Sequence, residues 1–445
     1  MKEENYDPDK LTPEEILELI LLKKTTFEKL RGSGTFPHSK QQKVRALLND
    51  EDEKSYKDAD SLENLKKYMQ LFPKGLHFDE ASKKALAMEE ENNAAQQKRI
   101  DTEKIIHEIE RDLNKYTVGE IKEKLSPEDL NQLCNRLGLD LNLIDKYKDP
   151  VLEFNDIPEK AKDIPREYTD VFFWGIPSSG KTCALSAILS TIKKNYTMEP
   201  PDLATKFGSV YRTNLVNIFR NDYGYLPNAT AVDRTQYMPF LFYKRGEKKK
   251  RKISFFELSG EVFKNFNVVV NNADTKISEE GEAEINKTFS LIELLLKSTN
   301  KKIHYFFIDY KKEKEDNLDN NFTQEDYLGA AATYFKDRKN IFKNNTDAVY
   351  VVITKSDEID GCDRQQQMEN AESFLKDKFG NFLEILKRQC DTYSIDFNIK
   401  LFSIGDVYFK RICRINRSFS TEIIEDLLEH VPAVSNNFWR KFLNS

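Results

Sequence analysis

A segment near the middle of the chain has the residue types and spacing of a phosphate-binding loop. Gly175-Ile-Pro-Ser-Ser-Gly-Lys-Thr182 fits the pattern G-x-x-x-x-G-K-[ST] without deviation. The glycines let the backbone curl, so that its N–H groups point at phosphate oxygens. Lys181 would reach the β and γ phosphates as a point charge, and Thr182 would offer a hydroxyl to Mg²⁺. The residues expected to touch the nucleotide here are Gly175, Ser178, Ser179, Gly180, Lys181, Thr182 and Cys183.

The elements that must position this loop are predicted from the apolar pattern after Pro165. Short apolar runs alternate there with helical stretches, which predicts an α/β domain whose largely parallel sheet is covered on both faces. The second and third runs are separated by a charged turn, so we expect an antiparallel hairpin at one sheet edge. The predicted strands are Val171–Trp174, Pro239–Tyr243, Ile253–Leu258, Ile303–Ile308, Ala348–Ile353 and Ile399–Phe402.

Residues 1–150 are predicted to form a helical N-terminal region. Thr12 and Pro13 are typical of a helix start, and Asp50 to Asp60 is predicted to be a charged turn. Ser126 and Gly138 would cap another helix. Prolines among charged residues place a linker at 151–167, followed by a second domain at 168–445. A long helix is predicted from Met88 to Tyr116, with an apolar stripe of Ile106, Ile109, Leu113 and Tyr116.

The composition excludes several classes of protein. The chain has 445 residues, of which 39% are hydrophobic and 32% charged, and its net charge is -6. This acidic balance excludes a globally basic nucleic-acid binder. The five scattered cysteines without Cys-x-x-Cys exclude a disulfide scaffold and a cysteine-rich zinc site, and they fit a cytoplasmic protein. No apolar run approaches the ~18 residues that a membrane span needs.

The basic run Lys244–Lys252 is either a nucleic-acid contact or an exposed hairpin tip, and we favour the tip.

Two further motifs follow the loop in a fixed order. The run KISFFELSGE ends a predicted strand in Glu257-Leu-Ser-Gly-Glu261, and DAVYVVITKSDEID ends another in Thr354-Lys-Ser-Asp357. A carboxylate at Asp357 can accept hydrogen bonds from the N1–H and the 2-amino group of guanine. Adenine lacks that pair of donors, so the discrimination is large.

With these motifs the sequence resembles the P-loop GTPases of the translation-factor-related (TRAFAC) class over residues 168–408. The resemblance implies a three-layer α/β/α G domain that binds GTP or GDP with Mg²⁺. It implies that Gly260 senses the γ-phosphate, that Glu257 replaces the usual Asp as a magnesium ligand, and that Glu261 stands where many members place a water-orienting Gln. Lys355 would lie along the base and Thr354 would brace the loop.

The resemblance also points to less well-defined parts of the site. Ser403 and Ile404 lie where the family has Ser-Ala-Lys, although Gly405 replaces the lysine. The first switch needs a threonine for Mg²⁺, and we prefer Thr230 over Thr235. The nearby Arg212, Arg220 and Arg234 are either arginine fingers or solvated loop charges. Residues 266–300 look like an insertion with a loop at Asn271–Glu284, and the segment Glu325–Phe342 looks like a helix of the family. Two C-terminal stretches, TEIIEDLLEHVP and NNFWRKFL, are also expected to be helices, and the second contains Trp439 and Phe442.

The expected activity is the hydrolysis of GTP to GDP and phosphate, with a protein effector or activator reading the state of the switch. Among GTPases the sequence looks most like the prokaryotic double-GTPase type associated with bacterial conflict or defence operons. Two alternatives stay open: an ATPase or nucleotide kinase on the same loop, and an interaction scaffold that binds nucleotide but hydrolyses it negligibly.

Overall fold

The chain folds into two compact units, Met1–Glu108 and Ile109–Ser445, which are treated separately. The computed structural model describes residues 6–201, 207–227, 235–247, 249–271, 279–314, 322–339, 341–343 and 345–434. The described residues before 150 are mainly helical, as predicted. Within the described residues, no helix is long and apolar enough to cross a membrane.

The first unit is a set of helices with small apolar cores. Thr12 caps the first helix in a capping box with Glu15, as its position predicted. The predicted turn at Asp50–Asp60 is wrong, because most of it continues a helix. Asp52 is buried there and accepts hydrogen bonds from the Tyr68 hydroxyl and from the Leu76 N–H. The helices are α1 (Pro13–Leu21), α2 (Phe27–Gly32), α3 (His38–Lys57), α4 (Leu62–Leu71) and most of α5 (Phe78–Arg111).

The second unit begins with the end of α5 and three short helices. Ile109 is buried as the apolar stripe predicted, but α5 ends at Arg111, so that Leu113 and Tyr116 lie beyond it. Ser126 caps α7, and Gly138 ends it with a left-handed φ of 64°, both as expected. The three helices are α6 (Val118–Lys124), α7 (Pro127–Leu137) and α8 (Leu141–Asp145).

A seven-stranded, mostly parallel sheet forms the centre of the second unit, with the order β2-β4-β5-β1-β6-β7-β8. This confirms the predicted α/β class. β4 and β5 form the predicted antiparallel hairpin, although β2, which was not predicted, makes the edge. Every residue of β1 is buried, as expected for a parallel strand covered on both faces. The strands are β1 (Thr169–Trp174), β2 (Tyr196–Glu199), β4 (Gln236–Lys244), β5 (Arg251–Glu257), β6 (Lys301–Asp309), β7 (Thr346–Thr354) and β8 (Asp396–Phe402).

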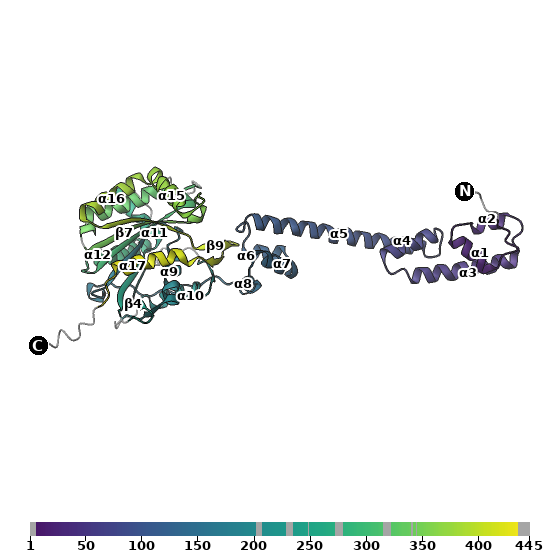
Figure 1. The fold of residues 1–445 in the computed structure, drawn as a ribbon, viewed down its shortest axis with the longest axis horizontal. Coiled ribbons are helices and arrows are strands. Elements are labelled where there is room, and N and C mark those ends of the chain that lie inside the picture. Colours follow the sequence, from purple (N-terminus) through teal and green to yellow (C-terminus); the bar gives the residue numbers. More distant parts are fainter. Residues whose placement is uncertain are drawn as a thin grey trace. The chain divides into compact units, whose positions relative to one another are not determined.

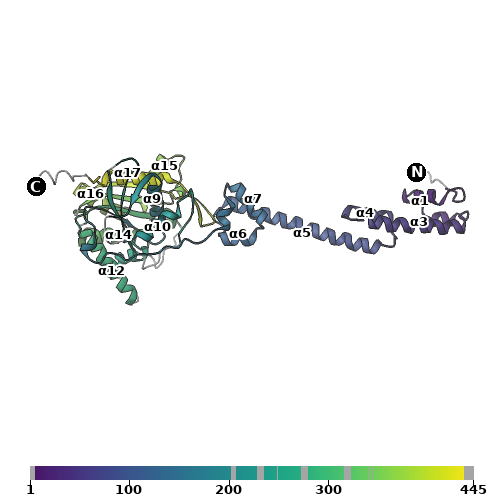
Figure 2. The same cartoon turned by 90° about the horizontal axis from the view of Figure 1, so that it is seen from below.

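Helices cover both faces of this sheet (Figure 1 and Figure 2). One face packs against α9 (Lys181–Asn195), α10 (Ser209–Ile218) and α17 (Arg417–His430). The other packs against α11 (Gly260–Asn271), α12 (Glu279–Lys297), α14 (Gln324–Tyr334), α15 (Arg364–Lys378) and α16 (Gly380–Tyr393). The described helices and the sheet therefore form three layers.

Several predicted segments need correction or lie outside the described residues. Glu279–Glu284, predicted as part of a loop, lie in α12, because the buried Leu291 and Leu295 hold this helix against the core. The predicted helix Glu325–Phe342 breaks after Tyr334 into a π-helix at Phe335–Lys339. The helix predicted at TEIIEDLLEHVP is confirmed as α17. The second C-terminal helix, with Trp439 and Phe442, lies outside the described residues, as does 272–278.

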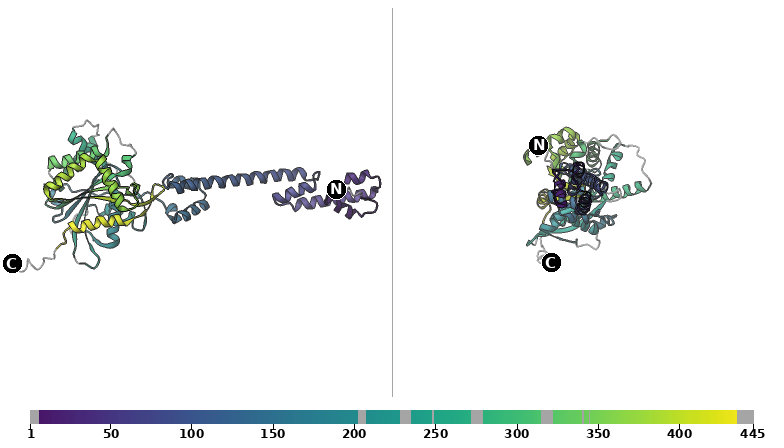
Figure 3. Two further views of the ribbon diagram at one scale, coloured as in Figure 1. Left: turned by 45° about the horizontal axis from the view of Figure 1, so that its top comes forward. Right: turned by 90° about the vertical axis from the view of Figure 1, so that its right-hand side faces the viewer.

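A small second sheet, which the sequence did not predict, lies beside the large one. It has the order β3-β10-β9, and its strands are β3 (Tyr223–Tyr225), β9 (Gly405–Tyr408) and β10 (Ile412–Ile415). Figure 3 shows the yellow hairpin of β9 and β10 reaching toward the blue helices α6–α8. Strand β3 of the same small sheet contacts these helices through a hydrogen bond from the Tyr225 hydroxyl to the Leu143 carbonyl at 2.9 Å.

Candidate functional site

The loop Gly175–Thr182, called the glycine loop below, connects the central strand β1 to the start of α9. Gly175 and Gly180 have φ angles of 150° and 83°, which L side chains rarely adopt. A Cβ on Gly175 would lie 2.8 Å from the Phe307 carbonyl oxygen. Ser178 also takes a left-handed φ, of 61°. The loop therefore has the curled backbone that the two glycines predicted.

The side chain of Lys181 lies inside the glycine loop. Its ammonium donates to the carbonyls of Gly175 and Ile176, both at 2.7 Å, and lies 3.3 Å from the Ser179 hydroxyl. Burial lowers the pKa of Lys181 to about 8, while the Glu257 carboxylate opposes the shift. A buried ammonium whose partners are neutral carbonyls is well suited to meet an anion.

Thr182 and Glu257 come together from α9 and the end of β5. The Thr182 hydroxyl donates to Glu257 Oε1 at 2.5 Å, and the Tyr211 hydroxyl donates to Oε2 at 2.7 Å. Burial raises the pKa of Glu257, and both hydrogen bonds oppose the shift. These hard oxygen donors at the mouth of the loop fit Mg²⁺. The described residues contain no group of three or more His, Cys, Asp or Glu that could hold a metal, so such a site would depend on Thr182 and Glu257. Tyr211 was not predicted.

Gly260 brings the start of α11 into contact with the glycine loop. A Cβ at this position would lie 2.2 Å from the Pro177 nitrogen and 2.4 Å from its Cα, so only glycine fits. Glu261 follows it, half exposed, with an ion pair of 3.5 Å to Lys264. The structure thus places Glu257, Gly260 and Glu261 around the loop.

Replacing Gly260 with alanine is expected to lower the free energy of unfolding by about 1–3 kcal/mol, because the new methyl group must displace loop backbone. Gly380→Ala is the matched control, since Gly380 also begins a helix but has open space around its Cα. Chemical denaturation measures both variants. If Gly260→Ala were as stable as Gly380→Ala, the close contact with Pro177 would be wrong.

The Thr354-Lys-Ser-Asp357 segment is braced directly against the glycine loop. The Thr354 hydroxyl lies 3.0 Å from the Ser179 carbonyl and 3.1 Å from that of Ile308. Lys355 adopts a left-handed φ of 55°, and its ammonium pairs with the buried Asp309 at 2.7 Å. Asp309 ends β6, next to Thr354 in the sheet register.

Asp357 lies in the short turn Ser356–Glu358, where its carboxylate is exposed and makes no hydrogen bond to another described residue. Asp357 and Cys183, the residue after Thr182, both lie near the Cys413 thiol. Burial is the main cause that raises the pKa of this thiol, and the charges of Cys183, Asp406 and Asp357 raise it further. Asp357 is therefore on the same side of the molecule as Cys183.

Ser403 and Ile404 leave the sheet next to this segment, because Phe402 is paired with Thr354 across β7 and β8. The Ser403 hydroxyl accepts a hydrogen bond from the Gly405 N–H at 3.2 Å. A lysine at position 405 would not fit. A Cβ there would lie 2.1 Å from the Arg414 carbonyl oxygen, and φ is 114°.

The structure describes only some of the residues that we expected in and near the first switch. Thr230, our preferred magnesium ligand, and Arg234 lie outside the described residues. Thr235 is buried and its hydroxyl has no hydrogen-bond partner among the described residues. Arg212 is buried and donates to the Pro239 carbonyl at 2.7 Å, so it holds α10 on β4 and is not a solvated loop charge. Arg220 is exposed.

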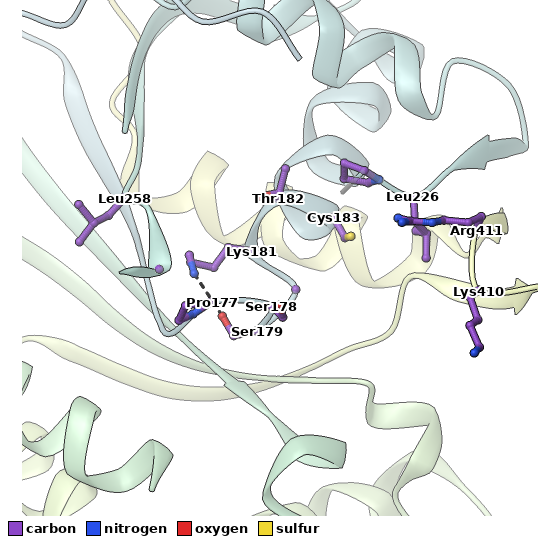
Figure 4. Close-up of a pocket in the computed structure, with 13 residues that line it drawn as sticks. Pro177, Ser178, Ser179, Lys181, Thr182, Cys183, Leu226, Leu258, Lys410 and Arg411 are labelled. Atoms are coloured by element: carbon purple, nitrogen blue, oxygen red, sulfur yellow. Dashed lines mark hydrogen bonds between the residues drawn. The ribbon is translucent and has the colours of Figure 1, made fainter. Parts of the chain in front are cut away.

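A cavity of about 200 Å³ opens over the glycine loop (Figure 4). Lys181 and Leu258 lie at one side of it in this view, and Leu226, Lys410 and Arg411 lie at the other. The sequence analysis did not predict the side formed by Leu226, Lys410 and Arg411, since these residues come from loops without a motif. The lining residues are Pro177, Ser178, Ser179, Gly180, Lys181, Thr182, Cys183, Leu226, Pro227, Leu258, Gly260, Lys410 and Arg411.

The basic run Lys244–Lys252 lies at the turn between β4 and β5, away from this cavity. Two of its lysines already have acidic partners: Lys250 pairs with Glu199 at 2.5 Å, and Lys252 with Glu167 at 3.3 Å. These ion pairs favour our interpretation of the run as a hairpin tip over a nucleic-acid contact.

No protein-family model matches this chain, and no curated protein matches it. The case for a function therefore depends on the geometry of the residues around the glycine loop.

Proposed function

We propose that the second unit is a P-loop GTPase domain, which binds GTP with Mg²⁺ and hydrolyses it to GDP and phosphate. The observation that carries this proposal is the bond between the Thr354 hydroxyl and the Ser179 carbonyl. It ties the segment suited to guanine to the loop suited to phosphate, so that one bound molecule can span both.

Each part of the site would act on a different part of the nucleotide. The loop amides and Lys181 would bind the phosphate chain, and Asp357 would accept the donors of the guanine edge. Thr182 and Glu257 would hold Mg²⁺, which neutralises phosphate charge. Glu261 follows Gly260 at the loop and offers a carboxylate that can orient water. Stabilisation of charge on the phosphates would supply most of the catalysis.

Loss of the γ-phosphate would change the contacts of Gly260, since its backbone packs on Pro177 at the loop. Such a change can move the start of α11, and so the domain would act as a nucleotide-dependent switch. A protein effector or activator would read that change.

Titration of the whole protein with fluorescent GTP and ATP in the presence of Mg²⁺ tests this proposal. We expect GTP to bind at least ~100-fold more tightly than ATP, because adenine leaves the Asp357 carboxylate unpaired. Equal or tighter binding of ATP would reject the guanine assignment and favour an ATPase or nucleotide kinase on the same loop.

A second candidate function is a nucleotide-binding scaffold with negligible hydrolysis. The ion pair between Glu261 and Lys264, at 3.5 Å, favours it, because this contact competes with an attacking water for the carboxylate. Phosphate release, measured with bound GTP over hours and with candidate partner proteins, distinguishes the two functions.

A further inference from the structure

The hairpin of β9 and β10 has an unusual and firmly held turn. Phe409, Lys410 and Arg411 connect the two strands, and the first two of them have left-handed φ angles, of 55° and 61°. Two positive φ angles match the right-handed twist of a tight hairpin, but residues other than Gly, Asn and Asp rarely adopt them. Phe409 is fully buried, which anchors the turn. Strain of this kind persists only where the surrounding structure determines the conformation.

Neighbouring segments fix the backbone of the hairpin at three positions. The Phe409 N–H donates to the Leu113 carbonyl at 2.7 Å, and the Lys410 N–H donates to the side-chain oxygen of Asn114 at 2.8 Å. The Leu226 N–H donates to the Arg411 carbonyl at 2.7 Å. The hairpin is therefore a rigid support, and these bonds fix the backbone positions from which the two basic residues of its turn, Lys410 and Arg411, extend.

Those two basic residues line the cavity over the glycine loop. Together with Lys181 they give the cavity three cations, and no carboxylate is among its lining residues. The side chains of Lys410 and Arg411 form no ion pair or hydrogen bond with other described residues. Glu120 acts on Lys410 only through space, and its carboxylate accepts hydrogen bonds from Thr117. A cavity with this charge distribution attracts a polyanion.

We propose that the β9–β10 hairpin is a second anion-binding element of the nucleotide site, in which Lys410 and Arg411 contact the phosphate chain of the bound nucleotide. This inference rests on the proposed function, since it needs a nucleotide on the glycine loop. Asn114 is then a positioning residue, because it holds the turn through the Lys410 N–H but does not line the cavity.

The test compares the Lys410→Gln/Arg411→Gln variant with wild type in titrations with fluorescent GTP and GDP at several salt concentrations. Glutamine keeps the length and polarity of the side chains and removes their charges. We expect affinity for both nucleotides to fall roughly 10- to 100-fold, because each lost charge-assisted bond is worth roughly a factor of ten. The dependence of affinity on salt should become shallower.

Lys244→Gln/Arg245→Gln is the matched control. It removes the same two charges from another hairpin, at the far end of β4, where the strand starts its turn to β5. Since β5 runs parallel to β1, this turn, which precedes β5, lies at the opposite end of the strands from the glycine loop, which follows β1. We expect its affinities to remain within twofold of wild type. Circular dichroism checks that every variant is folded.

Asn114→Ala adds a measurement that distinguishes positioning from general stability. Alone it should weaken GTP binding several-fold, and in the Lys410→Gln/Arg411→Gln background it should have no further effect. An equal loss in both backgrounds would show that Asn114 does not act through the hairpin cations and would overturn its role.

The two proposals fail in different ways. If wild type binds GTP and the Lys410→Gln/Arg411→Gln variant binds it equally well, the hairpin proposal is wrong while the proposed function stands. If wild type binds neither GTP nor ATP, the proposed function is wrong, and the hairpin proposal is rejected with it.

Discussion

Replacing Lys181 with alanine is expected to reduce affinity for GTP and ATP at least ~100-fold. The ammonium is buried inside the glycine loop, within 2.7 Å of two loop carbonyls, whereas Lys312 reaches only the Pro177 carbonyl, at 3.3 Å. Truncating one partner of a buried, hydrogen-bonded charge pair costs about 2–5 kcal/mol, and about 1.4 kcal/mol corresponds to a tenfold change in affinity. The loss should be similar for both nucleotides, because they share the same phosphate chain.

Isothermal titration calorimetry with each nucleotide measures this loss. Lys193→Ala is the matched control, since Lys193 is an exposed lysine near the other end of the same helix, α9. The control should bind like wild type. Tight binding by Lys181→Ala would contradict the assignment of the glycine loop as the phosphate site, whatever base the protein prefers.

Replacing Asp357 with alanine is expected to change base preference without changing the phosphate contacts. Affinity for GTP should fall about 100-fold, because the variant loses two hydrogen bonds from guanine to a charged acceptor. Affinity for ATP should stay within about threefold, since adenine offers no such pair of donors. The Asp357 carboxylate is exposed and bonds no other described residue, so its removal should leave the fold unchanged.

Glu358→Ala is the natural control for this variant. Glu358 is the neighbouring acid in the same turn, and it pairs with Lys311 at 3.4 Å at the surface. Competition of unlabelled GTP, ATP and ITP against a fluorescent nucleotide gives all affinities in one assay; ITP lacks the 2-amino group, so wild type should bind it less tightly than GTP. Equal losses for GTP and ATP in Asp357→Ala would contradict the role of Asp357 in base recognition.

Local sequence predicted the elements that depend on near neighbours. The strand before the glycine loop, the caps of α1 and α7 and the parallel core strands follow from apolar patterns and from capping residues a few positions apart. The prediction failed at Asp50–Asp60, where the run of charges is mainly the exposed side of α3. Its stability depends on Asp52 meeting Tyr68 from another helix, a contact that no local pattern reveals.

In the candidate site, too, short local motifs were predictable and contacts between distant segments were not. The motifs located the glycine loop, Glu257, Gly260 and the Thr354–Asp357 segment, since each is a short pattern at the end of a strand. They could not indicate Tyr211, Lys410 or Arg411, which come from elements without a motif. The sequence left two interpretations of Arg212, and the structure shows that its side chain is buried against the Pro239 carbonyl and is not solvated.

The sequence alone determined where the chain can curl into the glycine loop and which carboxylate, Asp357, we propose for guanine, because those properties belong to short stretches of chain. Tertiary structure decided that these stretches meet. The Thr354 hydroxyl reaches Ser179 across 175 positions of sequence, and the β9–β10 hairpin meets the residues after α5 across almost 300. Contacts over such separations depend on sheet order and packing, which emerge only when the whole second unit is folded.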